Sequence, residues 1–162
     1  MKSVGVFMFS AACGLLFGAA GCSTRCTLVG CVSNVSTVVS VEGDAESVVG
    51  SVVTMCQNDA CVSGTLEYAD KGAEMICSFE GEQPYWGTSC LAWVEGDQVT
   101  IWITLEVTDW YPLEQDTFRF VVASADDPDE VLAEREGKPD YEVLQPNGEE
   151  CGPTCYVATI GA

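Results

Sequence analysis

Apolar and polar residues alternate in short segments that recur at intervals of about 8–12 residues and are separated by Gly, Asp, Asn or Pro. In the clearest segment, every second residue from Val99 to Val107 is Val, Ile or Leu. Successive side chains of a strand point to opposite faces, so this period of two predicts a strand with one buried face. The strands predicted in this way are Val35–Val41, Ser51–Cys56, Cys61–Tyr68, Glu74–Phe79, Ser89–Val94, Val99–Val107, Thr117–Ser124, Tyr141–Gln145 and Cys155–Ile160. Their even spacing indicates an all-β sandwich or barrel.

Two local signals add detail to this pattern. Glu95–Gln98 is expected to form a hairpin turn in which Gly96 supplies a positive φ, so the strands on either side should pair. Pro128–Glu136 is the one helical candidate, because Asp127 can cap its start and Gly137 can end it. An edge strand is the alternative for this segment.

The N-terminal residues have the composition of a signal peptide. Lys2 precedes an uncharged apolar run, Val4–Ala20, which is short and rich in Gly and Ala for a membrane span of about 20 residues. The run leads into Ala19-Ala20-Gly21-Cys22, which looks like a lipobox, because small residues precede the cysteine that would receive the lipid. Ala19 stands where leucine is usual, and ordinary signal-peptide cleavage near Gly21 is the alternative.

The domain organisation follows from this segment. We expect a lipoprotein signal peptide at residues 1–21, which is removed, and a lipidated N-terminus with a short spacer at residues 22–25. Residues 26–162 should then form a single β domain, because this length is enough for one hydrophobic core.

The chain contains 10 cysteines, which an exported protein should hold as disulfides. If Cys13 leaves with the signal peptide and Cys22 is acylated, an even number is left to pair. These are Cys26, Cys31, Cys56, Cys61, Cys77, Cys90, Cys151 and Cys155. The pairings that the spacing favours are Cys56 with Cys61, Cys77 with Cys90, and Cys26 and Cys31 with Cys151 and Cys155, but the spacing does not decide among the alternatives.

The chain is strongly acidic, with 25 Asp and Glu residues, 6 Lys and Arg residues and a formal net charge of −19. Such a surface repels phosphates, which excludes nucleic acid as a partner. It is also repelled by anionic lipid within about 10 Å. A lipid on Cys22 would therefore hold a body that electrostatic repulsion pushes away from the membrane.

Histidine is absent, which removes the commonest general base and the commonest zinc ligand. Ser–His–Asp and Cys–His catalysis are therefore excluded. Cys151-Gly-Pro-Thr-Cys155 is similar to the redox-active Cys-Gly-Pro-Cys of thioredoxins, but it is one residue longer. Glu149 and Glu150 beside it would also disfavour a reactive thiolate. We expect these cysteines to form structural disulfides.

Acidic residues are so numerous that the proximity of two carboxylates would not by itself indicate a hydrolase, which needs an acid and a base flanking one cleft. Asp126, Asp127, Asp129 and Glu130 form a weak calcium candidate, because Ca²⁺ prefers hard oxygen ligands from one loop. The segment lacks the layout of a known calcium loop, and a capping role explains it equally well. No catalytic residue and no cofactor is expected.

Aromatic residues are the most suggestive group for binding. The candidates for a ligand-facing position are Tyr85, Trp86, Trp102, Trp110 and Tyr111. Trp102, like Trp93, points away from the expected buried face of its strand, whereas the other candidates fall in expected loops. Exposed rings offer flat platforms to sugars or to a partner protein, and packing beneath the loops is the alternative.

Three segments carry a resemblance to a known group of proteins. They are Cys26-Thr-Leu-Val-Gly-Cys31, Cys61-Val-Ser-Gly-Thr-Leu66 and Gln145-Pro-Asn-Gly-Glu-Glu-Cys-Gly-Pro-Thr-Cys155. With these cysteine and turn signatures the chain resembles uncharacterised cysteine-rich surface lipoproteins of the myxobacterial type. The resemblance implies an immunoglobulin-like antiparallel β-sandwich on the cell surface, and it implies no enzymatic activity.

The sequence therefore predicts a non-enzymatic binding or structural module of the bacterial cell envelope, anchored through Cys22 and engaging a protein or a glycan. Ser23 after the cysteine favours the outer membrane by the rule of enteric bacteria. One alternative is a carboxylate-based hydrolase, which requires two carboxylates with separated pKa values in one cleft. The other is a calcium-dependent adhesion domain.

Overall fold

Ten strands and one helical turn form the regular structure of residues 29–69, 74–79, 87–107 and 115–161, the parts of the chain that the computed structural model describes. The strands are β1 (Asn34–Glu42), β2 (Val52–Gln57), β3 (Ala60–Tyr68), β4 (Met75–Phe79), β5 (Ser89–Glu95), β6 (Gln98–Glu106), β7 (Phe118–Ala123), β8 (Val131–Gly137), β9 (Glu142–Leu144) and β10 (Cys155–Thr159). The helical turn, α1 (Ala45–Val48), is capped by Asp44, whose side chain accepts a hydrogen bond from the backbone N–H of Ser47.

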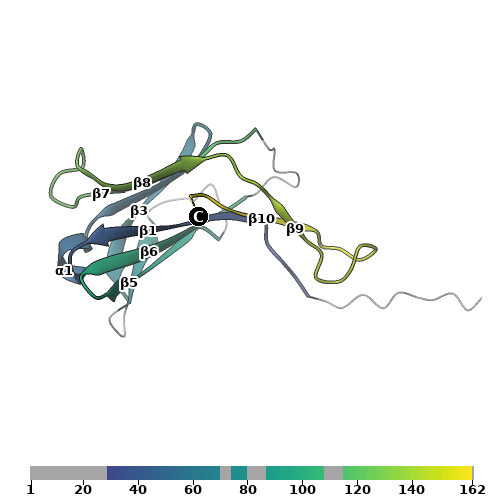
Figure 1. Ribbon diagram of the computed structural model, residues 1–162, viewed down its shortest axis with the longest axis horizontal. Coiled ribbons are helices and arrows are strands. Elements are labelled where there is room, and N and C mark those ends of the chain that lie inside the picture. The colour runs from purple at the N-terminus through teal and green to yellow at the C-terminus, as the bar shows by residue number, and fades with distance from the viewer. Residues whose placement is uncertain (1–28, 70–73, 80–86, 108–114, 162) are drawn as a thin grey trace, which may run out of the picture.

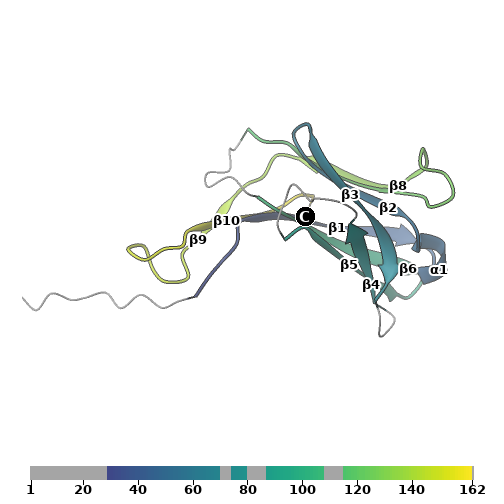
Figure 2. The same ribbon diagram turned by 180° about the vertical axis from the view of Figure 1, so that it is seen from behind.

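All ten strands belong to one hydrogen-bonded sheet with the order β8-β7-β2-β3-β4-β5-β6-β1-β10-β9. Every neighbouring pair is antiparallel except β1 and β10, which are parallel. The sheet folds over on itself, so that β2, β3, β7 and β8 lie across from β1, β5 and β6 (Figure 1), as the reverse view also shows (Figure 2). At the open seam β1 packs against β8, although the two are not neighbours in the hydrogen-bonded order. Strands β9 and β10 extend from this two-layered body as an arm.

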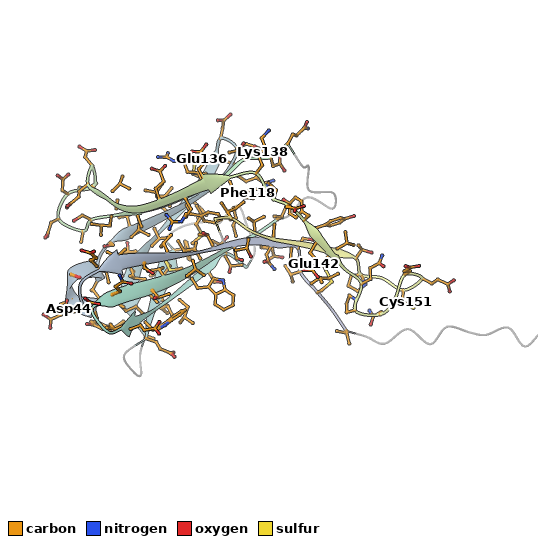
Figure 3. All side chains as sticks on the ribbon, in the orientation of Figure 1. Asp44, Phe118, Glu136, Lys138, Glu142 and Cys151 are labelled. Atoms are coloured by element: carbon orange, nitrogen blue, oxygen red, sulfur yellow. A yellow bond between two sulfur atoms is a disulfide. The ribbon has the colours of Figure 1, made fainter. Side chains whose placement is uncertain are left out.

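The core fills the space between the two layers. Alternate residues of β6 are fully buried, among them Ile101 and Ile103, and from the other layer Phe118 and Phe120 of β7 are fully buried as well. Figure 3, in which Phe118 is labelled, shows side chains from both layers meeting between the strands. The period of two predicted from Val99–Val107 is therefore the pattern by which this strand faces the core.

The predicted strands are confirmed to within about two residues at their ends, as is the hairpin between β5 and β6 with its positive φ at Gly96. The helix predicted at Pro128–Glu136 is wrong, and the alternative, an edge strand, is correct. This segment contains β8, which pairs with β7 at one end of the sheet. A helix of nine residues is marginal by itself, and pairing with β7 satisfies the backbone of this segment instead.

Disulfides join strands that are neighbours in the sheet. Cys56 and Cys61 link β2 to β3, and Cys77 and Cys90 link β4 to β5, which confirms both predicted pairings. Cys31, just before β1, is bonded to Cys155 at the start of β10. The predicted tie between the two ends of the domain is confirmed for this pair.

The all-β prediction is confirmed, with a single and mostly antiparallel ten-stranded sheet. An immunoglobulin-like fold does not follow from this arrangement. The two layers of an immunoglobulin-like fold are separate sheets, whereas in this protein one hydrogen-bonded ladder runs through both layers. The expected signal peptide at residues 1–21, the segment at residues 22–25 with Cys22, and Cys26 lie outside the described residues. Within the described ranges, no helix has the length and apolar character needed to cross a membrane.

Candidate functional site

A continuous row of exposed apolar side chains crosses the outer face of four neighbouring strands. Val38 of β1 stands opposite Trp102 of β6. Trp102 stands opposite Leu91 of β5, which in turn stands opposite Ile76 of β4. In the order β1 to β4, the exposed fractions are 47%, 50%, 38% and 44%. We call these four residues the outer row.

The outer row lies on the side of the sheet that faces away from the core. Trp102 stands between Ile101 and Ile103, both fully buried, and each other member of the row has buried or partly buried residues on both sides in its strand. A single exposed apolar side chain is normal on a protein surface and needs no explanation. A contiguous exposed row is different, because patches of this kind are where monomeric proteins bind their ligands and partners.

Uncharged polar side chains border the outer row along the strands. One border consists of Ser36, Thr104 and Ser89, which stand in register across their three strands. The other border consists of Ser40, Thr100 and Trp93, which stand in register in the same way. Each Ser or Thr hydroxyl can both donate and accept a hydrogen bond. The outer row and these two borders therefore combine flat apolar contact with adaptable hydrogen bonding.

Charged residues on this face lie at the ends of the strands, except for one carboxylate that stands directly beside the row. Glu42 and Glu95 lie at the ends of β1 and β5, two residues beyond the border with Ser40, and Glu67 of β3 stands opposite Ile76. The cations among the described residues are Arg119, Arg135 and Lys138, which lie on or just after β7 and β8 at the other end of the sheet. The outer face of β1, β4, β5 and β6 thus carries negative charge and no positive charge.

One of these cations is already paired. The Nε atom of Arg119 donates a hydrogen bond to Oε1 of Glu134 at 2.5 Å, and this bond raises the pKa of the Arg119 guanidinium. Both side chains are largely exposed, so the pair contributes little to stability. Its effect is local, because it joins the neighbouring strands β7 and β8 on their outer side.

A shallow hollow of about 170 Å³ lies between β1, β10 and the chain before β9. It is lined by Asn34, Ser36, Asp140, Glu142, Val157, Ala158 and Thr159. Asp140 and Glu142 bring two carboxylates to one rim, but both are exposed to solvent. A carboxylate pair that acts as acid and base needs one buried member whose pKa is raised. This hollow does not provide such a member.

A buried polar cluster connects the β2–β3 turn to the chain entering β7. Asp116, only 6% exposed, accepts hydrogen bonds from the side-chain amides of Gln57 and Asn58 at 3.0 and 2.9 Å. Asn58 also exchanges hydrogen bonds with the backbone of Thr117, and its own φ of +53° places it in the left-handed region. Buried carboxylates are stable only when they are hydrogen-bonded in this way, so the cluster acts as a structural clamp.

Tyr141 adds a buried phenol to the same end of the molecule. Its hydroxyl group has no hydrogen-bond partner among the described residues, and burial, followed by the negative charge of Asp116, raises its pKa well above the ordinary value. The phenol therefore stays protonated at neutral pH and is not available as a general base.

The Cys151–Cys155 segment does not contain a redox-active cysteine pair. Cys155 is bonded to Cys31, and Cys151 is disulfide-bonded as well. Both cysteines are buried: Cys151 is 4% exposed and Cys155 is 2% exposed. Figure 3 shows Cys151 at the far end of the β9–β10 arm. The structure thus supports the expectation that the cysteines of this segment form structural disulfides.

The calcium candidate forms the turn between β7 and β8. A side-chain oxygen of Asp127 accepts a hydrogen bond from the backbone N–H of Asp129, and the carbonyl oxygen of Asp127 accepts one from Glu130. Asp126 and its three acidic neighbours are exposed. In the described part of the chain, no three His, Cys, Asp or Glu side chains gather as metal ligands would. The calcium hypothesis therefore stays a prediction that no contact supports.

Sequence reasoning identified one of the four residues of the outer row. Trp102 is half exposed as expected, whereas Tyr85, Trp86, Trp110 and Tyr111 lie outside the described residues. The other three row residues were missed, because they form a row only through the pairing of their strands. The signal that could have found them is an apolar residue at an outward position of an alternating strand.

Comparisons of this chain with models of known protein families, with curated proteins and with solved structures find no match.

Proposed function

We propose that the protein is an exported, lipid-anchored and non-enzymatic binding module of the bacterial cell envelope, which recognises its ligand with the outer row. The outer row carries the proposal: four apolar side chains are in register across four strands and exposed on the face opposite the core. Burying them in the core is not an option for this fold, since the inner positions of the same strands are already filled. A bound ligand would remove this apolar surface from water.

The location of the protein is the second part of the proposal. It is supported by the lipobox-like sequence before Cys22, by the disulfides and by the acidic surface, which keeps the body away from anionic lipid. The resemblance to myxobacterial-type surface lipoproteins and the immunoglobulin-like classification belong to the proposal as well. Two packed layers of mostly antiparallel strands are what supports that classification.

Mass spectrometry of the intact protein from its native membrane tests the location. We expect a chain that begins at Cys22 and carries the diacylglyceryl group and an N-terminal acyl chain. On reduction, its mass should rise by two hydrogen atoms for each disulfide. The disulfides concerned are Cys31–Cys155, Cys56–Cys61, Cys77–Cys90 and the one that Cys151 forms. A Cys22→Ala variant should lack the acyl mass and leave the membrane. An unacylated mass for the natural chain would contradict the anchor.

Oxidative footprinting tests whether the outer row is occupied in the cell. Hydroxyl radicals oxidise exposed aromatic side chains, so we expect Trp102 to be oxidised several-fold less on intact cells than in the purified protein. Tyr68 is the matched control, since it is 49% exposed, close to the 50% of Trp102, and lies outside the row. Its oxidation should be the same in both samples. Equal oxidation of Trp102 in the two samples would refute the proposed binding role of the row.

A further inference from the structure

We infer that the ligand of the outer row is a linear, uncharged glycan whose sugar rings lie across β1, β6, β5 and β4. This inference rests on the proposed binding function and names the ligand class for the same surface. Three properties of the face support it: the spacing of the row, the character of its borders and its charge.

The spacing of the row matches a chain of sugar rings. Neighbouring strands lie about 4.8 Å apart, so the row from Val38 to Ile76 spans about 14 Å across the sheet. One strand spacing is close to the length of one sugar residue in an extended glycan. Successive rings can therefore each meet one apolar side chain, and the indole of Trp102 offers the C–H face of a ring its flattest contact.

The borders of the row match the edges of the same rings. A sugar ring lying on an apolar surface directs its hydroxyl groups sideways, where Ser36 and Thr104 stand on one side and Ser40 and Thr100 on the other. Hydroxyl groups that both donate and accept can pair with sugar hydroxyls in several orientations. A purely apolar ligand would make no use of the hydrogen-bonding capacity of these border groups.

The charge of the face favours an uncharged ligand. The chain has a net charge of −19, and the four strands that carry the row contain no cation, so uronic acids, phosphates and sulfates are repelled. A cationic peptide would be attracted at long range, and Glu67 beside Ile76 could pair with one of its charges. Its other charges would find no carboxylate in the two borders, because Glu42 and Glu95 lie beyond them. An uncharged glycan is neither repelled by the acidic surface nor left with unpaired charges in the borders.

The area of the row argues against a second copy of this chain. Four half-exposed side chains of this size present on the order of 300 Å². A stable protein interface buries about 800 Å² on each partner. A second copy would also bring its own charge of −19 against the first.

Affinity electrophoresis of the purified mature protein in native gels tests the inference. The gels contain soluble uncharged polysaccharides with extended backbones, namely mixed-linkage β-glucan, arabinoxylan and galactomannan, and dextran, with alginate and polygalacturonate as anionic counterparts. We expect at least one uncharged polysaccharide to retard the protein and the anionic ones to leave its migration unchanged. Binding should persist between low and high salt, since no charge attraction contributes to it.

The variant Trp102→Ala should bind the retarding polysaccharide at least about tenfold more weakly, because a central aromatic contact usually dominates such a surface. Val131→Thr is the matched control: Val131 is 49% exposed on β8, and this variant should bind like the natural protein. The far-ultraviolet circular dichroism and the melting temperature of each variant establish that it is folded.

Two results would overturn the inference, and they separate it from the proposed function. The first is absence of retardation in all uncharged gels, together with Trp102-dependent binding of a cationic amphipathic peptide or Trp102-dependent self-association in sedimentation velocity. This result rejects a glycan as the ligand and retains the outer row as the binding surface. Retardation that Trp102→Ala leaves unchanged rejects the outer row itself.

Discussion

Replacing Cys77 and Cys90 together by alanine is expected to lower the free energy of unfolding by about 3 kcal/mol and to weaken ligand binding at the outer row. The disulfide closes a loop with a sequence separation of 13, and removing a cross-link of this length releases chain entropy in the unfolded state. Its position adds a local effect. Cys77 follows Ile76 and Cys90 precedes Leu91, so the bond holds β4 to β5 beside two residues of the outer row.

Urea unfolding followed by tryptophan fluorescence measures the loss of stability, and affinity electrophoresis measures the loss of binding. The matched control is the pair Cys56→Ala and Cys61→Ala, which opens a disulfide with a sequence separation of 5 in the β2–β3 hairpin. It should lower stability by about 2 kcal/mol and leave binding unchanged, because neither cysteine borders the row. Equal losses of binding in both double variants would mean that the Cys77–Cys90 bond has no local effect on the row.

The strands were predictable because the alternation of apolar and polar residues within each strand shows which of its faces meets the core. In β6 the alternation from Val99 onward fixes both the strand and its buried side. The segment before Gly137 was harder, because Asp127 and Pro128 provide the same local start for a helix as for a turn followed by a strand. Pairing with β7, which lies in another part of the sequence, decides in favour of the strand.

The outer row could not be predicted for a different reason. Trp102 and Leu91 belong to a hairpin and are paired by local sequence, but Val38 reaches Trp102 only because β1 adds to the far side of β6. Sequence alternation states which residues face outward, and it leaves open which strands are neighbours. A binding surface on the face of a sheet depends on both kinds of information.

The largest single-residue loss of stability is expected from Phe120→Ala, at about 3–5 kcal/mol. Phe120 is fully buried and stands opposite Met55 of β2, which is also fully buried. Removing its ring leaves a cavity between the two layers, and the sheet can collapse into this space only by moving strands whose positions the hydrogen-bonded ladder fixes. Because small domains are stable by about 5–15 kcal/mol, this loss is a large share of the total free energy of unfolding.

Val121→Ala is the control for this prediction, since Val121 is the next residue of β7, points to the opposite face and is only partly buried. It should cost well under half as much as Phe120→Ala in urea unfolding, because surrounding water replaces part of its contacts. If the two variants lose equal stability, the space between the layers is not the main core of the protein. If Phe120→Ala remains folded and still binds the ligand of the outer row, the inner face of the sheet determines stability and the outer face determines recognition, each independently of the other. The alternation of buried and exposed residues in β6 implies this division of roles.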